Sequence, residues 1–395
     1  MPTLLHLVTE ASAVRGMNTA ALQIVPRSRS NLLVRLVVRF VLPFALGPSL
    51  AVLAAPFAYI TNGNSNSVSV VDIAVDSVIA TIAVGVTPIG VAVNTTGARA
   101  YVTNQSDNTI SAIDTATNAV IATIPVSAGA GPTGVALNAT GTRAYVTNVF
   151  ASTVSVIDTG ANAVIGAPIA VGNTPWGVAV NPLATRVYVA NRASSTVSII
   201  DTATNAVIGA PVPVGNSPQG IAIDPTGSRV YVTNLGSNTV SVIDAGTNVV
   251  IATIPVGANP GFVAVNPAGT RAYVTNFLSN TVSVIDIATN TVIGAPIAVG
   301  AFPVGIGADP TGSRIYVANS GSNNVSIIDA ISNAVVGTAI AVGTSPVAFG
   351  IFIGGTGALA SGAQAIPSLG SLATSLMALA IAFLGWRRLR SGVDA

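Results

Sequence analysis

Residues 218–256 read PQGIAIDPTGSRVYVTNLGSNTVSVIDAGTNVVIATIPV. Four short runs rich in β-branched residues stand here between turn residues, at 220–223, 230–234, 239–243 and 249–256. Each run has the length of a β-strand. The segment Asp224-Pro-Thr-Gly227 has Pro and Gly where a type I turn favours them. The stretch therefore predicts four antiparallel strands and no helix.

Seven copies of this unit follow one another along the chain. The seven Tyr, one in the second run of each unit, are separated by 42, 44, 43, 43, 42 and 43 residues. An Asn lies three residues after each Tyr, and an Asp lies thirteen residues after it. Four antiparallel strands repeated with this period are typical of a β-propeller. We therefore predict an all-β, seven-bladed β-propeller of four-stranded antiparallel blades.

The phase of the repeats predicts how the ring closes. The first unit begins at its second run, residues 58–62, so it lacks a first run. At the other end, residues 349–353 form a first run with no further run after it. We expect this C-terminal strand to join the N-terminal blade, which leaves no large exposed sheet edge. The expected domains are 1–57 as N-terminal extension and signal peptide, 58–353 as propeller, 354–365 as a Gly/Ala/Ser-rich linker and 366–395 as a C-terminal sorting signal.

Composition excludes several kinds of chemistry. Only 7% of the 395 residues are charged, and the chain has no Cys and no Lys. Disulfides, thiolate sites and a catalytic lysine are therefore excluded, and a His-based metal centre or triad would have to use His6, the single His. Residues 58–366 hold seven Arg and eleven Asp, a net charge of 7 − 11 = −4. This balance disfavours a nucleic-acid partner.

The repeated tetrad resembles a known family. Tyr231-Val-Thr-Asn234 and the same tetrads headed by Tyr101, Tyr145 and Tyr273 resemble the YVTN β-propeller repeat. Three units depart from it mildly, with Ile60, Ala190 and Ala318. The resemblance covers about three quarters of the chain. It implies an exported, surface-layer-type propeller with no shared catalytic residues.

The N-terminal segment has the pattern of a secretory signal. Arginines precede an uncharged run from Phe40 to Ile60, which ends among small residues. Prolines inside the run argue against a long membrane helix. Starts at Met1 and at Met17, cleavage after Ala54 or after Ala58, and an uncleaved anchor are all compatible with it. We expect the propeller on the periplasmic or cell-surface side of a bacterial envelope.

The C-terminal segment predicts one transmembrane helix. An uncharged stretch from Leu369 to Trp386 would span about 27 Å as a helix. Three arginines follow it, at 387, 388 and 390, and predict a cytoplasmic tail. With Ile366-Pro-Ser-Leu369 before it, the segment resembles IPTL- and PEP-type sorting signals, although Ser368 departs from the pattern. The resemblance implies an exosortase-like processing protease; a plain membrane anchor is the alternative. An unknown envelope protein or glycan is the other expected partner.

Strand pairing turns the repeated Arg and Asp into predicted ion pairs. If Asn234 pairs with Thr239 across the loop, Arg229 lies opposite Asp244. Each such pair would contribute about 0.2–1 kcal/mol, and the Asp would also hold its turn. Asp72, which faces Phe57, is expected to hold a turn alone. The expected pairs are Arg99–Asp114, Arg143–Asp158, Arg186–Asp201, Arg229–Asp244, Arg271–Asp286 and Arg314–Asp329.

The loops that differ between units give the candidate binding residues. Phe150, Trp176, Arg192 and Gln219 are expected at one face of the ring, because propeller topology places their loops there. The alternative is that the aromatic residues only fill gaps between blades.

No residue stands out as catalytic, as a metal ligand or as a cofactor ligand, because Asp224 and Asp309 take the Asn position of a repeated turn. We therefore expect a binding or structural scaffold without catalysis. The alternative is a periplasmic propeller enzyme of lactonase or quinoprotein type.

Overall fold

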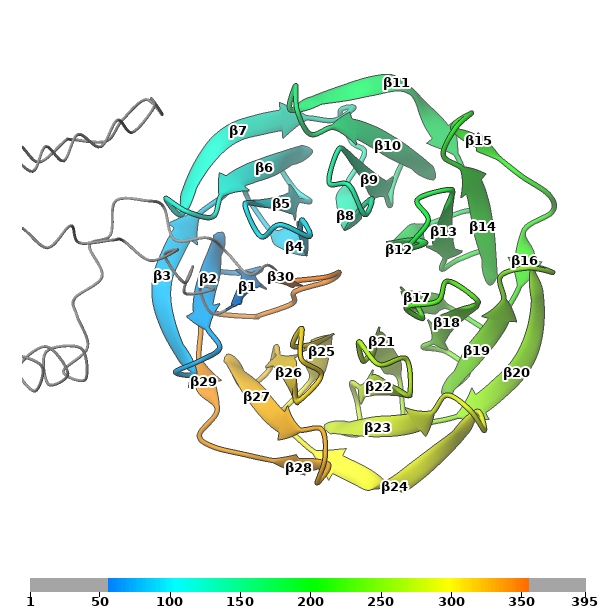
Figure 1. Cartoon of the computed structure of the whole chain (residues 1–395). Coiled ribbons are helices and arrows are strands. Elements are labelled where there is room, and N and C mark those ends of the chain that lie inside the picture. The colour runs from blue at the N-terminus through cyan, green and yellow to red at the C-terminus, as the bar shows by residue number, and fades with distance from the viewer. Residues whose placement is uncertain (1–55, 355–395) are drawn as a thin grey trace, which may run out of the picture. The chain divides into compact units, whose positions relative to one another are not determined.

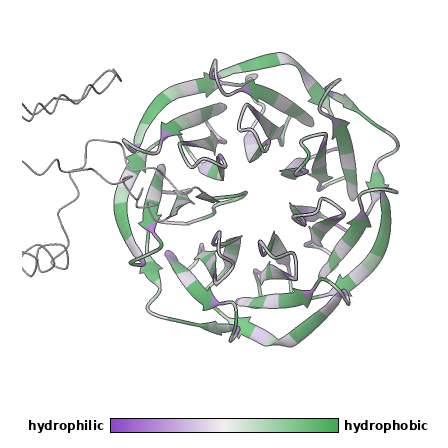
Figure 2. Ribbon diagram, viewed as in Figure 1, coloured by the Kyte–Doolittle hydropathy of each residue, from purple (hydrophilic) through white to green (hydrophobic). Residues whose placement is uncertain are grey.

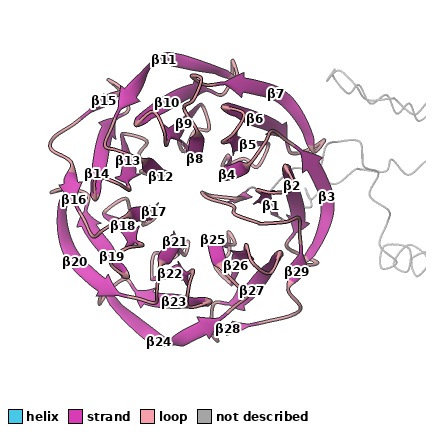
Figure 3. Ribbon diagram, turned by 180° about the vertical axis from the view of Figure 1, so that it is seen from behind, coloured by secondary structure: helices cyan, strands magenta, loops and turns pink. Residues whose placement is uncertain are grey.

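The computed structural model describes residues 56–354, which form a ring of seven antiparallel sheets (Figure 1). Figure 3 shows only strands and loops in this part of the chain. We call the strands of a blade A to D from the axis outward. A–B and C–D turns lie on one face of the ring, and B–C and D–A loops lie on the other. The predicted all-β, seven-bladed propeller is confirmed.

Six blades are built from consecutive segments. Blade 1 is β4 (Pro88–Val93), β5 (Arg99–Asn104), β6 (Thr109–Asp114) and β7 (Ala119–Pro125); blade 2 is β8 (Pro132–Leu137), β9 (Arg143–Asn148), β10 (Thr153–Asp158) and β11 (Ala163–Ala170); blade 3 is β12 (Pro175–Val180), β13 (Arg186–Asn191), β14 (Thr196–Asp201), β15 (Ala206–Val207) and β16 (Val212–Pro213). Blade 4 is β17 (Pro218–Ile223), β18 (Arg229–Asn234), β19 (Thr239–Asp244) and β20 (Val249–Pro255); blade 5 is β21 (Pro260–Val265), β22 (Arg271–Asn276), β23 (Thr281–Asp286) and β24 (Thr291–Ala298); blade 6 is β25 (Pro303–Ala308), β26 (Arg314–Asn319), β27 (Asn324–Asp329), β28 (Ala334–Val335) and β29 (Ile340–Ala341).

Blade 7 joins the two ends of the described chain, as predicted. It consists of β1 (Phe57–Asn62), β2 (Ser67–Asp72), β3 (Ser77–Ala83) and the C-terminal β30 (Ile353–Gly354). β30 pairs with Phe57 and Ala58 of β1, and Pro346 forms a further bridge to Asn62. No helix with the length and hydropathy of a membrane span lies within residues 56–354. The predicted N-terminal extension and signal peptide, 1–57, lies outside the described residues except for Pro56 and Phe57, the latter the first residue of β1, and the predicted helix over 369–386 lies wholly outside them.

The core lies between neighbouring blades. Strands B and C are almost entirely buried, whereas the outer D strands alternate between exposed and partly buried residues. Figure 2 shows the resulting apolar strands with polar residues at turns and loops. All seven Tyr are at most 1% exposed. Burial of a Val or Ile side chain stabilises a fold by about 1.5–3 kcal/mol, so the many Val and Ile residues of the repeat favour this packing between blades.

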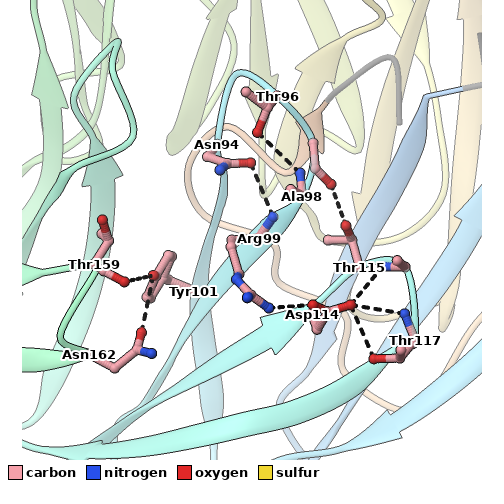
Figure 4. A network of polar contacts seen from close by, with 12 residues as sticks. Asn94, Thr96, Ala98, Arg99, Tyr101, Asp114, Thr115, Thr117, Thr159 and Asn162 are labelled. Atoms are coloured by element: carbon pink, nitrogen blue, oxygen red, sulfur yellow. Dashed lines mark hydrogen bonds and ion pairs between the residues drawn. The ribbon is translucent and has the colours of Figure 1, made fainter. Parts of the chain in front are cut away.

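Two of the seven phenol groups, those of Tyr101 and Tyr316, donate hydrogen bonds to the C–D turn of the next blade. The Tyr101 hydroxyl donates to Thr159 O and to Asn162 Oδ1, both at 3.2 Å, in the C–D turn of blade 2 (Figure 4). Burial raises the pKa of Tyr101, because it disfavours the phenolate. Burial, with the Asp76 carboxylate beside it, raises the pKa of Tyr316 to about 12. These tyrosines are therefore neutral structural residues.

The predicted register is correct, but most of the predicted ion pairs are not formed. All six Arg lie opposite their Asp: Arg99–Asp114, Arg143–Asp158, Arg186–Asp201, Arg229–Asp244, Arg271–Asp286 and Arg314–Asp329. Among the described residues, only Arg99 reaches its own Asp, at 2.5 Å (Figure 4). The other five guanidinium groups donate to the C–D turn of the next blade, to Thr202 O, Ala245 O, Ile287 O, Ala330 O and Asp76 Oδ2.

The Asp carboxylates do hold their own turns, as predicted. Asp114 Oδ1 accepts the N–H groups of Ala116 and Thr117 and the Thr117 hydroxyl. These hydrogen bonds favour the ionised form: although burial, the largest single influence, raises the pKa of Asp114, they and the nearby Arg99 lower it overall. Asp72 likewise accepts the Ala74 N–H. Holding the turn does not by itself prevent the ion pair, because Asp114 accepts the turn N–H groups through Oδ1 and the Arg99 guanidinium through Oδ2.

One C–D turn differs from the others. Asp76 stands where the other blades have Asn, and it pairs with Arg314 at 2.7 Å across the junction of blades 6 and 7. The two residues are 238 positions apart in the chain. This ion pair therefore stabilises the junction that closes the ring.

Asp76→Asn is expected to lower the free energy of unfolding by about 0.2–1 kcal/mol, because a partly exposed ion pair becomes a neutral hydrogen bond. The reverse variant, Asn333→Asp, places a carboxylate opposite Arg271, which donates to Asn333 Oδ1 at 3.4 Å, and should stabilise by a similar amount. Urea unfolding at low and high salt measures both. Equal effects at both salt concentrations would contradict the electrostatic origin.

Candidate functional site

The seven A strands surround the axis, and glycine sets their spacing. The third residue of strand A is Gly in five blades, at positions 90, 134, 177, 220 and 305. A Cβ at Gly134 would overlap the backbone of Trp176 in the next blade. In blade 5 this position holds Phe262, and in blade 7 the chain between Pro346 and β30 bulges at Phe349–Ile351. These two exceptions place large side chains at the axis.

The blade 7 bulge reaches inward beyond the other A strands (Figure 1). It runs parallel to β4 of blade 1, whose Val91 and Val93 N–H groups donate to Phe349 O and Ile351 O at 2.7 and 2.9 Å. Gly350, with φ of 112°, allows this path, because the backbone conformation is one that other residues rarely adopt. The hydrogen bonds fix the bulge in place.

Three aromatic rings meet at the axis. Phe349 stacks on Phe262 at 3.9 Å between ring centroids and lies 6.0 Å from Trp176. Both Phe residues are buried, at 4% and 7% exposure. They lie near the start of their A strands, on the side of the D–A and B–C loops. We call Phe262 and Phe349 the aromatic floor, because they line the inner end of the cavity described next.

A cavity of about 620 Å³ occupies the axis between the aromatic floor and the A–B turns. Its wall is apolar, with small side chains such as Ala136, Ala179, Ala222 and Ala264. Ligand-binding pockets commonly have volumes of about 300–1,000 Å³ and apolar walls with few polar groups. The cavity therefore has the size and lining of a small-molecule site.

Polar residues line the end of the cavity nearest the A–B turns. Asn94, Asn138, Asn181, Asp224 and Asp309 occupy equivalent positions there in blades 1 to 4 and 6. Asn138 and Asn181 donate their amides to Thr142 and Thr185 of their own turns, at 3.0 Å each. Within residues 56–354 the Asn94 Nδ2 makes no such bond. The two Asp are the only charged residues in the described cavity lining.

Asp224 is ionised at neutral pH. Burial acts to raise the pKa of Asp224, but hydrogen bonds from the Arg229 N–H and from the Thr226 and Ser228 hydroxyls outweigh it and lower that pKa. Asp309 accepts the matching three hydrogen bonds. Both Asp residues are buried, at 6% exposure, and line the cavity. No group of three or more His, Asp or Glu side chains gathers within residues 56–354.

The predicted binding residues lie on the opposite side of the floor, and only two of them meet. The Arg192 guanidinium lies 5.2 Å from the Trp176 ring, a cation–π contact. Gln219 is buried at 8% exposure, and its Oε1 has no partner among the described residues. Phe150 is 73% exposed and lies against Gly131. The cavity itself was not predicted, and Asp224 and Asp309 were interpreted only as turn residues. The signal in the sequence is Phe262, which stands where five blades have Gly.

Comparison with known proteins agrees with the fold. A family model described as "Lactonase, 7-bladed beta-propeller" matches residues 112–248 and 164–294, which together cover less than half of the chain. A search of the curated proteins found no match.

Several solved structures are similar. A functionally unknown protein from Desulfotomaculum acetoxidans DSM 771 is 18% identical, with 76% of this chain and 99% of that chain covered and a TM-score of 0.65. A proposed 6-phosphogluconolactonase from Bacteroides uniformis ATCC 8492 is 16% identical, with coverage of 74% and 98% and a TM-score of 0.64. Hydrazine synthase of Kuenenia stuttgartiensis is 23% identical, with coverage of 61% and 76% and a TM-score of 0.56. Because all three identities are below 25%, these similarities show a shared fold and nothing further.

The expectation of a scaffold without catalysis is corrected by the family match. The model that matches the central blades is that of a lactonase, so the comparison favours the alternative, an enzyme-type propeller. The expectation rested on interpreting Asp224 and Asp309 as turn residues only, with no group of carboxylates at one mouth.

Phe349→Ala is expected to lower the free energy of unfolding by about 3–5 kcal/mol, because a buried ring is replaced by a void. The emission of Trp176 should change as well, since the two rings are neighbours. Urea unfolding in a Trp386→Phe background, where Trp176 is the single Trp, measures both effects. Phe150→Ala is the control, with an expected change of about 0.5 kcal/mol. Equal losses in the two variants would contradict the aromatic floor.

Proposed function

We propose that the protein is a propeller hydrolase that opens a small lactone or ester in the axial cavity. The cavity itself, about 620 Å³ with an apolar wall and a polar mouth, is the observation that carries the proposal. The match of residues 112–294 to the lactonase model supports the same reaction class.

Hydrolysis of a lactone needs two kinds of polar group. The oxygen of water adds to the carbonyl carbon, the ring C–O bond breaks, and the proton passes to the leaving oxygen to give a hydroxy acid. An acceptor must orient the water, and a donor must stabilise the charge that develops on the carbonyl oxygen.

The cavity mouth offers both groups. The carboxylates of Asp224 and Asp309 are the candidate acceptors, and the Asn94 amide is the candidate donor. Because its pKa is lowered, Asp224 would orient a water by hydrogen bonding and act only weakly as a base. The apolar wall would hold the rest of the substrate.

Purified full-length protein is expected to hydrolyse members of a panel of neutral lactones and aryl esters, followed as acid release. Ala179→Phe, which fills the cavity, should reduce kcat/KM at least tenfold, and Asp224→Asn with Asp309→Asn should reduce kcat. Ala163→Phe, at an exposed position of β11, is the matched control and should retain activity.

Thermal unfolding of each variant shows whether it is folded. Turnover that survives Ala179→Phe would place the reaction elsewhere. Absence of turnover with every lactone and ester would contradict the proposed reaction class.

We propose further that the YVTN-type propeller is exported and held at the bacterial envelope. The basic and apolar N-terminal segment and the sequence of residues 366–390 support this location. The membrane, an exosortase-like protease and an envelope protein or glycan are the partners that such a location would supply. Fractionation of tagged protein with and without residues 366–395 separates membrane retention from release.

A further inference from the structure

We propose that the axial cavity selects neutral or cationic amphipathic ligands with an apolar acyl or aryl body, and that it rejects phosphorylated and other anionic ones. The inference rests on the proposed function, since it names the substrate class of the same cavity. It rests independently on the charge and the polarity of the described lining.

No cation lines the described cavity. The chain has no Lys, and residues 56–354 contain seven Arg. Arg99 is engaged by Asp114. Five others donate to the C–D turn of the next blade, and Arg192 lies over Trp176 on the far side of the floor. A phosphate brought into the cavity would therefore lose its water without gaining a charged partner, which is unfavourable.

The carboxylates of Asp224 and Asp309 add repulsion. Both line the cavity, and the hydrogen bonds to Asp224 hold its pKa below the usual range. An anion that enters the mouth would meet two negative charges in a partly desolvated place, where charges interact more strongly than in water. A neutral carbonyl or a cationic group would meet no such barrier.

The remaining lining fits an apolar body. Phe262 and Asn266 lie four residues apart, so the wall between floor and mouth is about 13 Å long along the strand. Alanine side chains and the two stacked Phe rings cover this distance. An acyl chain or a flat ring can contact them while the hydrolysable group stays at the polar mouth.

A matched pair of fluorescent probes tests the inference. N-phenyl-1-naphthylamine is neutral, and 1-anilinonaphthalene-8-sulfonate has nearly the same aromatic body with one negative charge. Full-length protein with Trp386→Phe should bind the neutral probe at least tenfold more tightly. Energy transfer from Trp176, the remaining Trp, should report binding because this ring lies 6.0 Å from Phe349.

Two sets of variants locate the probe. Ala179→Phe should abolish the energy transfer, and Ala163→Phe should keep it. The double variant Asp224→Asn with Asp309→Asn should raise the affinity for the sulfonate probe. Both substitutions are compatible with the fold, because the other blades have Asn at this position: Asn94, Asn138, Asn181 and Asn266. Thermal unfolding identifies any variant that fails to fold; the Asp variants then carry the test.

The outcomes separate the two proposals. Binding of the neutral probe without turnover of any lactone would sustain the ligand class and contradict the hydrolase. Turnover of phosphorylated sugar lactones in preference to neutral ones would overturn the ligand class and sustain the hydrolase. Equal affinity for both probes, unchanged by the Asp variants, would also overturn it.

Discussion

A threonine hydroxyl near the axis is the contact that joins blade to blade. Thr147 Oγ1 accepts the Gly134 N–H at 2.8 Å within its own blade and donates to Trp176 O of the next blade at 2.7 Å. Blades 1, 4, 5 and 7 repeat the contact to the following blade at 2.7–2.9 Å. It requires the strands to approach closely, which the Gly of strand A permits. The width of the cavity follows from this spacing.

The two blades that lack this Thr are also the least regular in the ring. Ala190 and Ala318 replace the Thr in blades 3 and 6, so these blades lack the hydroxyl. Their outer strands are also the two that break, into β15 and β16 and into β28 and β29. At the junction after blade 6 the Arg314–Asp76 ion pair is present. The sequence changes that looked mild thus coincide with changes in how blades are joined.

The sequence predicts the ring well because each blade repeats the same local information. Tyr spacing, turn residues and the phase of the units predicted blade number, register and closure through β30. The destination of the arginines could not be predicted, since pairing rules within a hairpin do not show that the next blade offers carbonyl groups such as Ala245 O. The cavity was missed for a related reason. It depends on Phe262 and Phe349, from blades 5 and 7, meeting across the axis.

The aromatic floor and the closing strand belong to one short stretch of chain. Phe349 caps the cavity, and Ile353 begins the strand that completes blade 7. Until that stretch docks, the preceding strands would enclose a tube open at both ends. Within the described residues, a chain synthesised from its N-terminus therefore completes the axial cavity last. A ligand that contacted Phe349 would favour the closed ring over the open one, because it would bind only when this stretch is docked.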